Sequence, residues 1–322
     1  MQILSTKTKS PTGSHLVLMF GLGMIGSAIR DSLFDFEYHL MAKIDFDWQD
    51  GAQRDRAFSL IETSCLAYSP PPDRVSIVWS AGKGAFHSTQ DELSRENIPF
   101  MDTVGFVSKL TKTLDSARLD FHYISSAGGL FEGQRVINDK SIPAPVRPYG
   151  RLKLAQEQVL RGSFGENEIA FYRPSSVYGP MVQKSQQGLI NNLVSNGRNG
   201  RVTVLDAHVM ALRDYVFSGD VGNFVAKRIR SGNTGVNGSP VHFLVSARCS
   251  SIFEVVRKIE RTLNLNLQFR YDESFGNNSN ITFSDSILPP GWSPSTLDVG
   301  IRQFLVGKSA HLRSLPAMPL VH

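Results

Sequence analysis

The first half of the chain repeats one pattern, in which a short, mostly apolar run is followed by a turn and then by a longer amphipathic segment. Such short runs are typical of strands that are buried on both faces of a parallel sheet. They occur at 16–20, 38–44, 75–79, 119–124 and 170–174. Helical segments lie between them, among them 91–117 and the segment that begins at Pro148. This alternation predicts an α/β fold with a doubly wound parallel sheet.

The second half mixes further strands and helices. Extended runs occur at 201–205 and 241–245, and helices are expected at 188–194, from Asp220 onward, at 251–263 and at 297–305. We expect a first domain over 15–175, with segments near 204–220 and 241–245 returning to it. A smaller α/β domain, mainly 176–310, would then cover a cleft. Residues 1–14 and 309–322 are predicted to be tails.

A glycine-rich turn joins the first predicted strand to the first helix. Its spacing is Gly-x-Gly-x-x-Gly, formed by Gly21, Gly23 and Gly26 around Met24 and Ile25. Glycines allow a tight turn and a close approach of the backbone to a pyrophosphate, which rests on the positive helix N-terminus. The turn therefore predicts a dinucleotide site. The small residue Ala81, after the strand at 75–79, lies where such a cofactor would pass.

An acidic residue follows the second strand. Asp45 stands 19 positions beyond Gly26, where a carboxylate can accept hydrogen bonds from the adenosine ribose and repel a 2′-phosphate. This favours NAD over NADP. Asp47 is close enough to be the partner instead, and Lys43 or Arg54 could soften the preference. Alternatively, Asp45 only ends the strand.

Tyr149 and Lys153 are four residues apart, so on a helix they lie on the same face. A phenol titrates near ~10, and a neighbouring ammonium favours the phenolate and lowers that pKa. Ser126, at the carboxyl end of the strand 119–124, could hold a substrate oxygen against the phenol. The set suits proton transfer at an alcohol while a hydride leaves the same carbon. A surface Tyr–Lys pair is the alternative interpretation.

Composition and charge narrow the function further. The 322 residues are 41% apolar and 20% charged, which is ordinary for a soluble globular protein. The net charge is +5, and the Lys and Arg residues are scattered along the chain, so no nucleic-acid-binding surface is indicated. Cys65 and Cys249 are the only cysteines and lack metal-ligand spacing, so we expect no metal site and a reducing, cytoplasmic location. The longest apolar run, 16–29, is too short for a membrane span.

Taken together, the motifs resemble the extended short-chain dehydrogenases/reductases of the NAD-dependent epimerase/dehydratase group, which mostly act on nucleotide sugars. The resemblance implies a Rossmann fold, NAD as cofactor and Ser126, Tyr149 and Lys153 as the catalytic residues, with Lys153 also holding the nicotinamide ribose. The matching pieces, in family order, are residues 21–26, Asp45, 78–81, 123–127, 149–153 and 173–180.

The resemblance also implies substrate residues. Ser176 occupies a position where the family often has asparagine, and Arg213 matches an arginine that often faces the substrate diphosphate. A guanidinium fits phosphate oxygens, although an internal ion pair with Asp214 or Asp220 is an equal alternative for Arg213.

Family 4,6-dehydratases carry an Asp-Glu pair after the catalytic serine or threonine, whereas this chain has Ala127 and Gly128. This counts against dehydration. We therefore expect an NAD-dependent nucleotide-sugar epimerase with a role in polysaccharide biosynthesis. C4 is the sugar carbon at which we expect it to act. An NAD(P)H-dependent keto-sugar reductase is the alternative, and a non-catalytic NAD(H)-binding regulatory module is a second. Family members often dimerise through the helix that carries the catalytic tyrosine, so a homodimer is expected.

Overall fold

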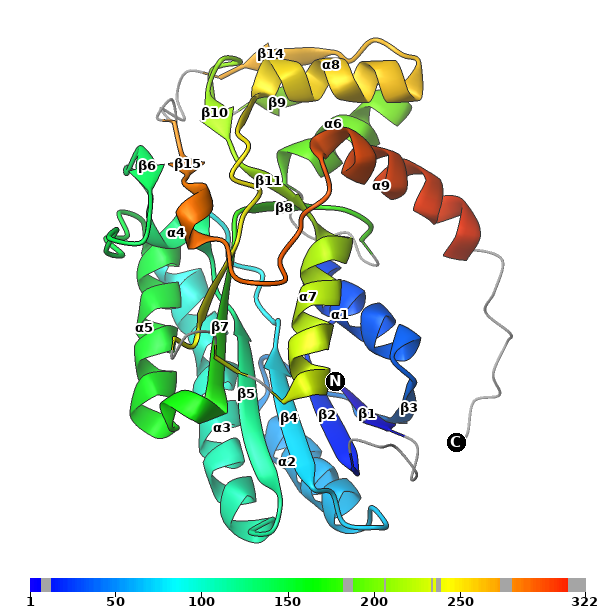
Figure 1. Cartoon of the computed structure of the whole chain (residues 1–322), viewed down its shortest axis with the longest axis vertical. Coiled ribbons are helices and arrows are strands. Elements are labelled where there is room, and N and C mark those ends of the chain that lie inside the picture. Colours follow the sequence, from blue (N-terminus) through cyan, green and yellow to red (C-terminus); the bar gives the residue numbers. More distant parts are fainter. Residues whose placement is uncertain are drawn as a thin grey trace.

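The computed structural model describes residues 1–6, 13–181, 188–205, 207–232, 234–235, 239–272 and 280–311, with side chains up to Leu305. Its centre is a seven-stranded sheet in the order β12-β7-β5-β4-β2-β1-β3 (Figure 1). All of these strands are parallel except β1. The predicted doubly wound α/β fold is thus confirmed. Strand bounds are β2 (His15–Phe20), β3 (Tyr38–Lys43), β4 (Arg74–Trp79), β5 (Arg118–Ile124), β7 (Ile169–Pro174) and β12 (Val241–Leu244).

The first residues differ from expectation. The predicted tail at 1–14 contains β1 (Gln2–Thr6), which lies inside the sheet between β2 and β3 and is antiparallel to both. Gln2 is opposite Met19 on one side and Lys43 on the other. Ile3 and Leu4 are fully buried. Only two of its five residues, Ile3 and Leu4, are apolar, so β1 shows neither an apolar run nor a clear alternation.

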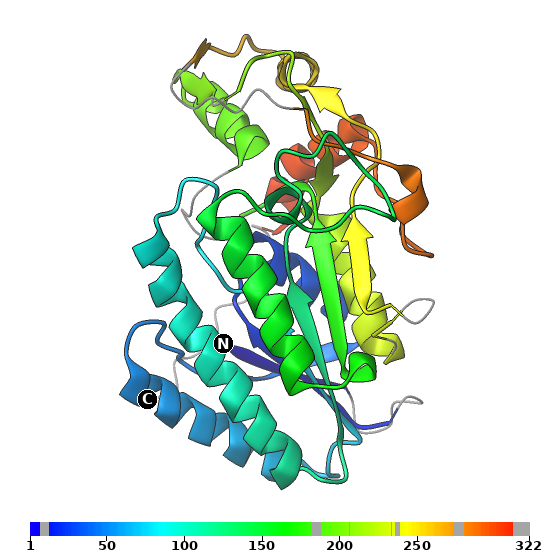
Figure 2. The same cartoon turned by 90° about the vertical axis from the view of Figure 1, so that its left-hand side faces the viewer.

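Helices cover both faces of the sheet. On one face lie α2 (Gly51–Leu66), α3 (Gln90–Thr113) and α5 (Pro148–Ser163), which Figure 2 shows side by side. On the other face α1 (Met24–Asp35) packs along α7 (Ser218–Ser231). Each face has its own apolar core, and both are built from the inward positions of amphipathic helices and the buried strands.

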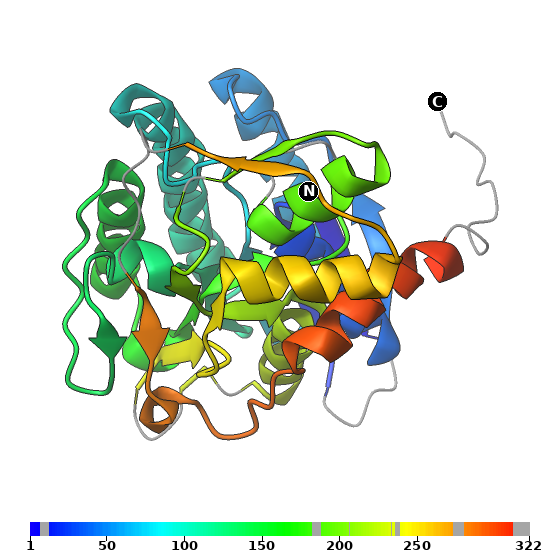
Figure 3. The ribbon, with the colours of Figure 1, turned by 90° about the horizontal axis from the view of Figure 1, so that it is seen from above.

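A smaller layer covers the carboxyl edge of the sheet (Figures 1 and 3). In it α8 (Ile252–Leu263) packs against α9 (Leu297–His311) and α6 (Leu189–Arg198) around a third core. The remaining strands form short pairs: β8 (Ser176–Tyr178) with β11 (Tyr215–Phe217), β9 (Thr203–Leu205) with β14 (Phe269–Tyr271), β10 (Leu212–Arg213) with β13 (Ser250–Ser251), and β6 (Val136–Ile137) with β15 (Thr282–Phe283).

Of the segments expected to return to the first domain, 241–244 joins the sheet as β12, and α7 packs on one sheet face. Residues 203–205 and 212–217 pair within the smaller layer instead. The boundary between the two parts stays a prediction. The expected tail at 309–322 begins within α9, and residues 312–322 lie outside the described part.

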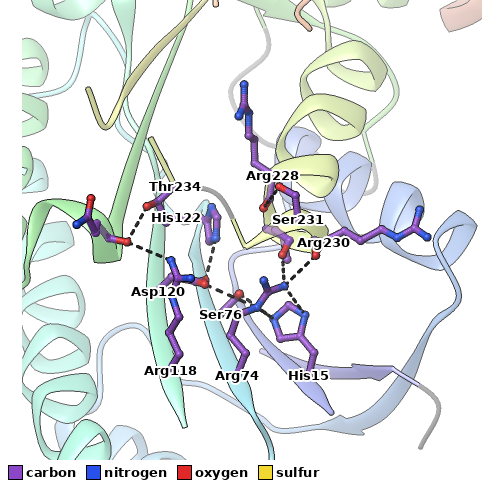
Figure 4. A network of polar contacts seen from close by, with 12 residues as sticks. His15, Arg74, Ser76, Arg118, Asp120, His122, Arg228, Arg230, Ser231 and Thr234 are labelled. Atoms are coloured by element: carbon purple, nitrogen blue, oxygen red, sulfur yellow. Dashed lines mark hydrogen bonds and ion pairs between the residues drawn. The ribbon is translucent and has the colours of Figure 1, made fainter. Parts of the chain in front are cut away.

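The amino edge of the sheet carries a buried polar network (Figure 4). His15 contacts the Tyr38 hydroxyl through Nδ1 at 2.6 Å and the Ser76 hydroxyl through Nε2 at 2.8 Å. The Arg74 guanidinium donates to main-chain carbonyls at the end of α7 and lies 3.8 Å from Asp120. This network therefore ties the four strands β2, β3, β4 and β5 to α7. In the described helices, none is both long enough and apolar enough to cross a membrane.

Candidate active site

A cleft of about 460 Å³ lies at the carboxyl edge of the sheet, below the smaller layer. Its lining comes from the glycine turn, the ends of β4, β5 and β7, the start of α5, and the smaller layer. Open α/β sheets bind ligands at this edge. Of the predicted site residues, the cleft is lined by Gly23, Met24, Ile25, Ala81, Ser126, Tyr149, Lys153, Ser176 and Arg213.

The glycine turn is packed so closely at Gly21 and Gly26 that neither position has room for a side chain. Gly21 has a φ of +88°, and a Cβ there would lie 2.5 Å from the backbone of Ala81. A Cβ on Gly26 would lie 2.1 Å from the Gly21 carbonyl oxygen. The Ser80 hydroxyl donates to that carbonyl at 2.6 Å, which fixes the end of β4 against the turn.

The first turn of α1 fits a pyrophosphate. Gly23 is the N-cap and supplies no side-chain hydrogen bond, and no acidic residue lies in the first turn. The N–H groups at the start of the helix are therefore available to an anion, and the helix dipole adds positive potential. Gly23, Met24 and Ile25 are the residues here that would hold the cofactor.

Asp45 lies apart from the cleft lining. Its side chain is exposed just beyond β3, and β1 separates β3 from β2. Two strand spacings, about 10 Å, therefore separate β3 from the strand that carries the glycine turn. The chain then folds back, because the Phe46 ring packs 5.3 Å from that of Phe20. Asp47 accepts hydrogen bonds from the backbone of Gln49 and Asp50. The part played by Asp45 in ribose binding stays a prediction.

The structure brings Ser126, Tyr149 and Lys153 together. Ser126 caps the short helix α4 (Ala127–Leu130) by accepting the Gly129 N–H at 3.1 Å. Helix α5 begins at Pro148, which places Tyr149 in its first turn. A Cβ on Gly150 would lie 2.0 Å from the Gly129 carbonyl oxygen, so α4 and α5 approach closely only with glycine there. This contact sets the serine beside the phenol.

Lys153 is 6% exposed, and a hydrogen bond to the end of β5 fixes its side chain. Its Nζ donates to the Ile124 carbonyl at 3.2 Å and lies 5.9 Å from the centroid of the Tyr149 ring. Burial lowers the pKa of Lys153, while the carboxylates of Glu96 and Glu157 act in the opposite direction.

The acidity of Tyr149 differs from the sequence-based expectation. Burial raises its pKa to about 12, a hydrogen bond with Ser126 acts to lower it, and the charge of Glu96 raises it further. The expected lowering by the Lys153 ammonium is not found. The physical reason is that moving a phenolate out of water costs more free energy than the attraction of a distant ammonium contributes. With the protein groups alone, Tyr149 is a protonated acid at neutral pH.

Behind the catalytic candidates lies a buried ion pair. Glu157 accepts hydrogen bonds from Arg173 at 3.0 and 2.6 Å and from the Ser125 hydroxyl at 2.6 Å. These contacts join β5, β7 and α5 beneath the cleft. Arg173 is thus a structural residue, and the segment 174–178 after it lines the cleft.

At the other end of the cleft, Ser176 is exposed and Arg213 is 8% exposed. One guanidinium N–H of Arg213 donates to the Leu212 carbonyl at 2.9 Å. The two carboxylates considered as ion-pair partners have serine partners: Asp214 accepts from Ser175 and Ser246, and Asp220 accepts from Ser295. A substrate role for Ser176 and Arg213 stays a prediction.

Glu96 is a cleft residue that sequence reasoning missed. It lies in the second turn of α3 and accepts the N–H groups of Lys83 and Gly84, each at 2.7 Å. A glutamate in an amphipathic helix matches no motif, so no sequence signal pointed to it. Among the residues described, no group of three or more His, Cys, Asp or Glu side chains could hold a metal ion.

Several solved structures share this fold. UDP-glucose 4-epimerase from Thermus thermophilus, in complex with NAD, is 18% identical with a TM-score of 0.67 over 90% of this chain and 97% of its own. UDP-glucose 4-epimerase from Thermotoga maritima, with UDP-glucose, is 18% identical with a TM-score of 0.70 over 92% and 99%. RMD from Pseudomonas aeruginosa, complexed with NADPH, is 19% identical with a TM-score of 0.67 over 92% and 99%.

The sequence also matches a protein-family model over most of its length. Residues 17–244 match the model described as the NAD dependent epimerase/dehydratase family. The match runs from β2 to β12 and so includes the glycine turn, the three catalytic candidates and Arg213.

Proposed function

The chain belongs to the NAD-dependent epimerase/dehydratase family of enzymes, and on that premise we propose that it is a nucleotide-sugar epimerase. It would oxidise and re-reduce one sugar carbon, with C4 as the first candidate. The main support for the proposal is that Ser126, Tyr149 and Lys153 lie close together in the cleft, which also includes the glycine turn. UDP-sugar 4-epimerases among the structural neighbours support the choice of substrate class.

When bound, NAD supplies a hydride acceptor and donor. In the proposed cycle, Tyr149 takes the proton of the sugar hydroxyl and later returns it, so no net proton is consumed. Ser126 holds the same oxygen by a hydrogen bond. Since the protein alone leaves Tyr149 protonated, its phenolate form needs positive charge bound beside it. Lys153, whose Nζ lies 5.9 Å from the centroid of the Tyr149 ring, would hold the nicotinamide ribose.

The positions after Ser126 argue against dehydration. A dehydratase needs a further acid and base to remove a proton and expel water, and Ala127 and Gly128 offer neither. Ala127 is fully buried. At the far end of the cleft, Arg213 is suited to a diphosphate, and Ser176 is exposed to the same space.

The test is incubation with NAD and a panel of UDP-, GDP- and dTDP-sugars, followed by separation of the isomers. An isomer without net NADH formation supports the epimerase. Stoichiometric loss of NAD(P)H with keto-sugars would instead identify a reductase. Cofactor binding with no turnover of either kind would leave a regulatory binding module.

We also propose a cytoplasmic homodimer that serves polysaccharide biosynthesis. The described cysteines, Cys65 and Cys249, are both free, which suits a reducing compartment.

Helices α3 and α5 lie side by side at the surface, and α3 exposes Ile98 by 51% and Met101 by 43% (Figure 2). Light scattering at the mass of two chains, reduced to one chain by Ile98→Asp, would support the dimer. A monomeric wild type would refute it.

A further inference from the structure

Glu96 reaches the cleft from α3 and is enclosed by the loop after β4. One carboxylate oxygen, Oε2, accepts the backbone N–H groups of Lys83 and Gly84. The other, Oε1, would be 2.7 Å from a Cβ at Gly82, whose φ is +136°. The loop can therefore wrap around the carboxylate only because residue 82 is glycine. Among the described residues, Oε1 forms no hydrogen bond or ion pair.

This carboxylate faces the catalytic residues. Oε1 of Glu96 and Cδ2 of Tyr149 each lie 3.3 Å from the position that a Cβ would take at Gly84. Its charge acts on both Tyr149 and Lys153. Glu96 thus lies at the end of the cleft where the proposed hydride transfer takes place, across the glycine from the phenol.

The neighbouring carboxylates have different surroundings. Glu157 is bound by the guanidinium of Arg173. Asp214 also lines the cleft, but it accepts three hydrogen bonds from Ser175 and Ser246, and burial raises its pKa. Glu96 instead has two neutral N–H donors and, among the described residues, no ion-pair partner at hydrogen-bond distance. Such donors hold the carboxylate in place without cancelling its charge.

We propose that Glu96 makes the cofactor site prefer oxidised over reduced nicotinamide. The oxidised ring carries a positive charge and the reduced ring is neutral, so a carboxylate fixed at this end of the cleft would favour the oxidised form of a bound cofactor. An epimerase needs its cofactor oxidised when each sugar arrives. The inference deepens the proposed function, since it explains how the cycle returns to NAD after each turnover.

The test is calorimetric titration of NAD and of NADH, separately, into the wild type, Glu96→Gln and Asp91→Asn. The glutamine keeps an oxygen for the Lys83 and Gly84 N–H groups and removes the charge. The control removes an exposed carboxylate from the first turn of the same helix. We expect the ratio of the NADH to the NAD dissociation constant to fall about tenfold in Glu96→Gln. Asp91→Asn should keep the wild-type ratio.

An unchanged ratio in Glu96→Gln, or an equal fall in Asp91→Asn, would overturn the proposal. Glu96→Asp retains the charge and should retain most of the preference, which covers the case of a glutamine variant that fails to fold. The measurement needs no sugar. A wild type that binds both cofactors but isomerises no sugar would refute only the epimerase, whereas a wild type that binds neither would refute this inference as well.

Discussion

The side chain of Lys153 runs from α5 into the buried end of the cleft, where its ammonium has one main-chain acceptor. Lys153→Met keeps much of the apolar stem and removes the charge. We expect NAD affinity to fall about tenfold or more, because a charged hydrogen bond to the cofactor is lost, and turnover to fall further. Calorimetry and initial rates measure the two effects. Arg151→Met, an exposed change on the same helix, is the control, and unchanged NAD affinity in Lys153→Met would contradict the assignment.

At the residue scale, some properties of the site could be predicted from the sequence and others could not. The spacing of Tyr149 and Lys153 was sufficient to predict that they share a helix face, because helix geometry is local. The acidity of Tyr149 was predicted in the wrong direction, since its burial depends on the loop after β4 and on α4, which pack against its ring. Glu96 was missed for a related reason. Its approach to Tyr149 depends on the loop at 82–84, which no local pattern describes.

At the scale of elements, β1 changes the distance between two parts of the cofactor site. It places β3 one strand farther from β2, which carries the glycine turn, than a direct β2–β3 pair would, and the chain returns toward β2 only at Phe46. A short antiparallel strand from the start of the chain has no motif, so this insertion could be found only from the structure. The parallel strands, by contrast, were predictable from their apolar runs.

Asp45→Ala tests the ribose assignment. We expect the preference for NAD over NADP to relax by about tenfold at most, because repulsion of a 2′-phosphate weakens with distance and is screened by salt. The ratio of the two dissociation constants is the measurement, with Asp47→Ala as the matched variant. A change in Asp47→Ala together with an unchanged ratio in Asp45→Ala would move the role to Asp47.

At the scale of the whole molecule, buried neutral histidines make the fold sensitive to acid. Burial, then the Arg74 guanidinium and His122, lowers the pKa of His15 to about 3 against the pull of Asp120. Burial also lowers the pKa of His242 to about 4, against its hydrogen bond to the Thr234 carbonyl. Both lie on the sheet face that packs against α7, and Figure 4 shows the contacts of His15 with Ser76 and Arg74.

The unfolded chain takes up these protons near pH 6.5, whereas the native state does so only near pH 4 and 3. Stability should therefore be complete above about pH 6.5 and fall as the pH decreases, by about 1.4 kcal/mol per pH unit for each histidine. Urea unfolding at several pH values measures this slope. His242→Phe should show a shallower slope below pH 6.5, and His39→Gln, an exposed change on β3, should keep the wild-type slope. Identical slopes in all three proteins would contradict the prediction.

The central claim is that the phenol of Tyr149 carries the proton of the reacting hydroxyl. The most direct test is Tyr149→Phe with the sugar that the wild type isomerises, measuring turnover and the NAD dissociation constant in the same preparation. We predict that turnover falls about a thousandfold or more while NAD binding stays within about twofold, since only the transferable proton is removed. Turnover close to that of the wild type would contradict the account.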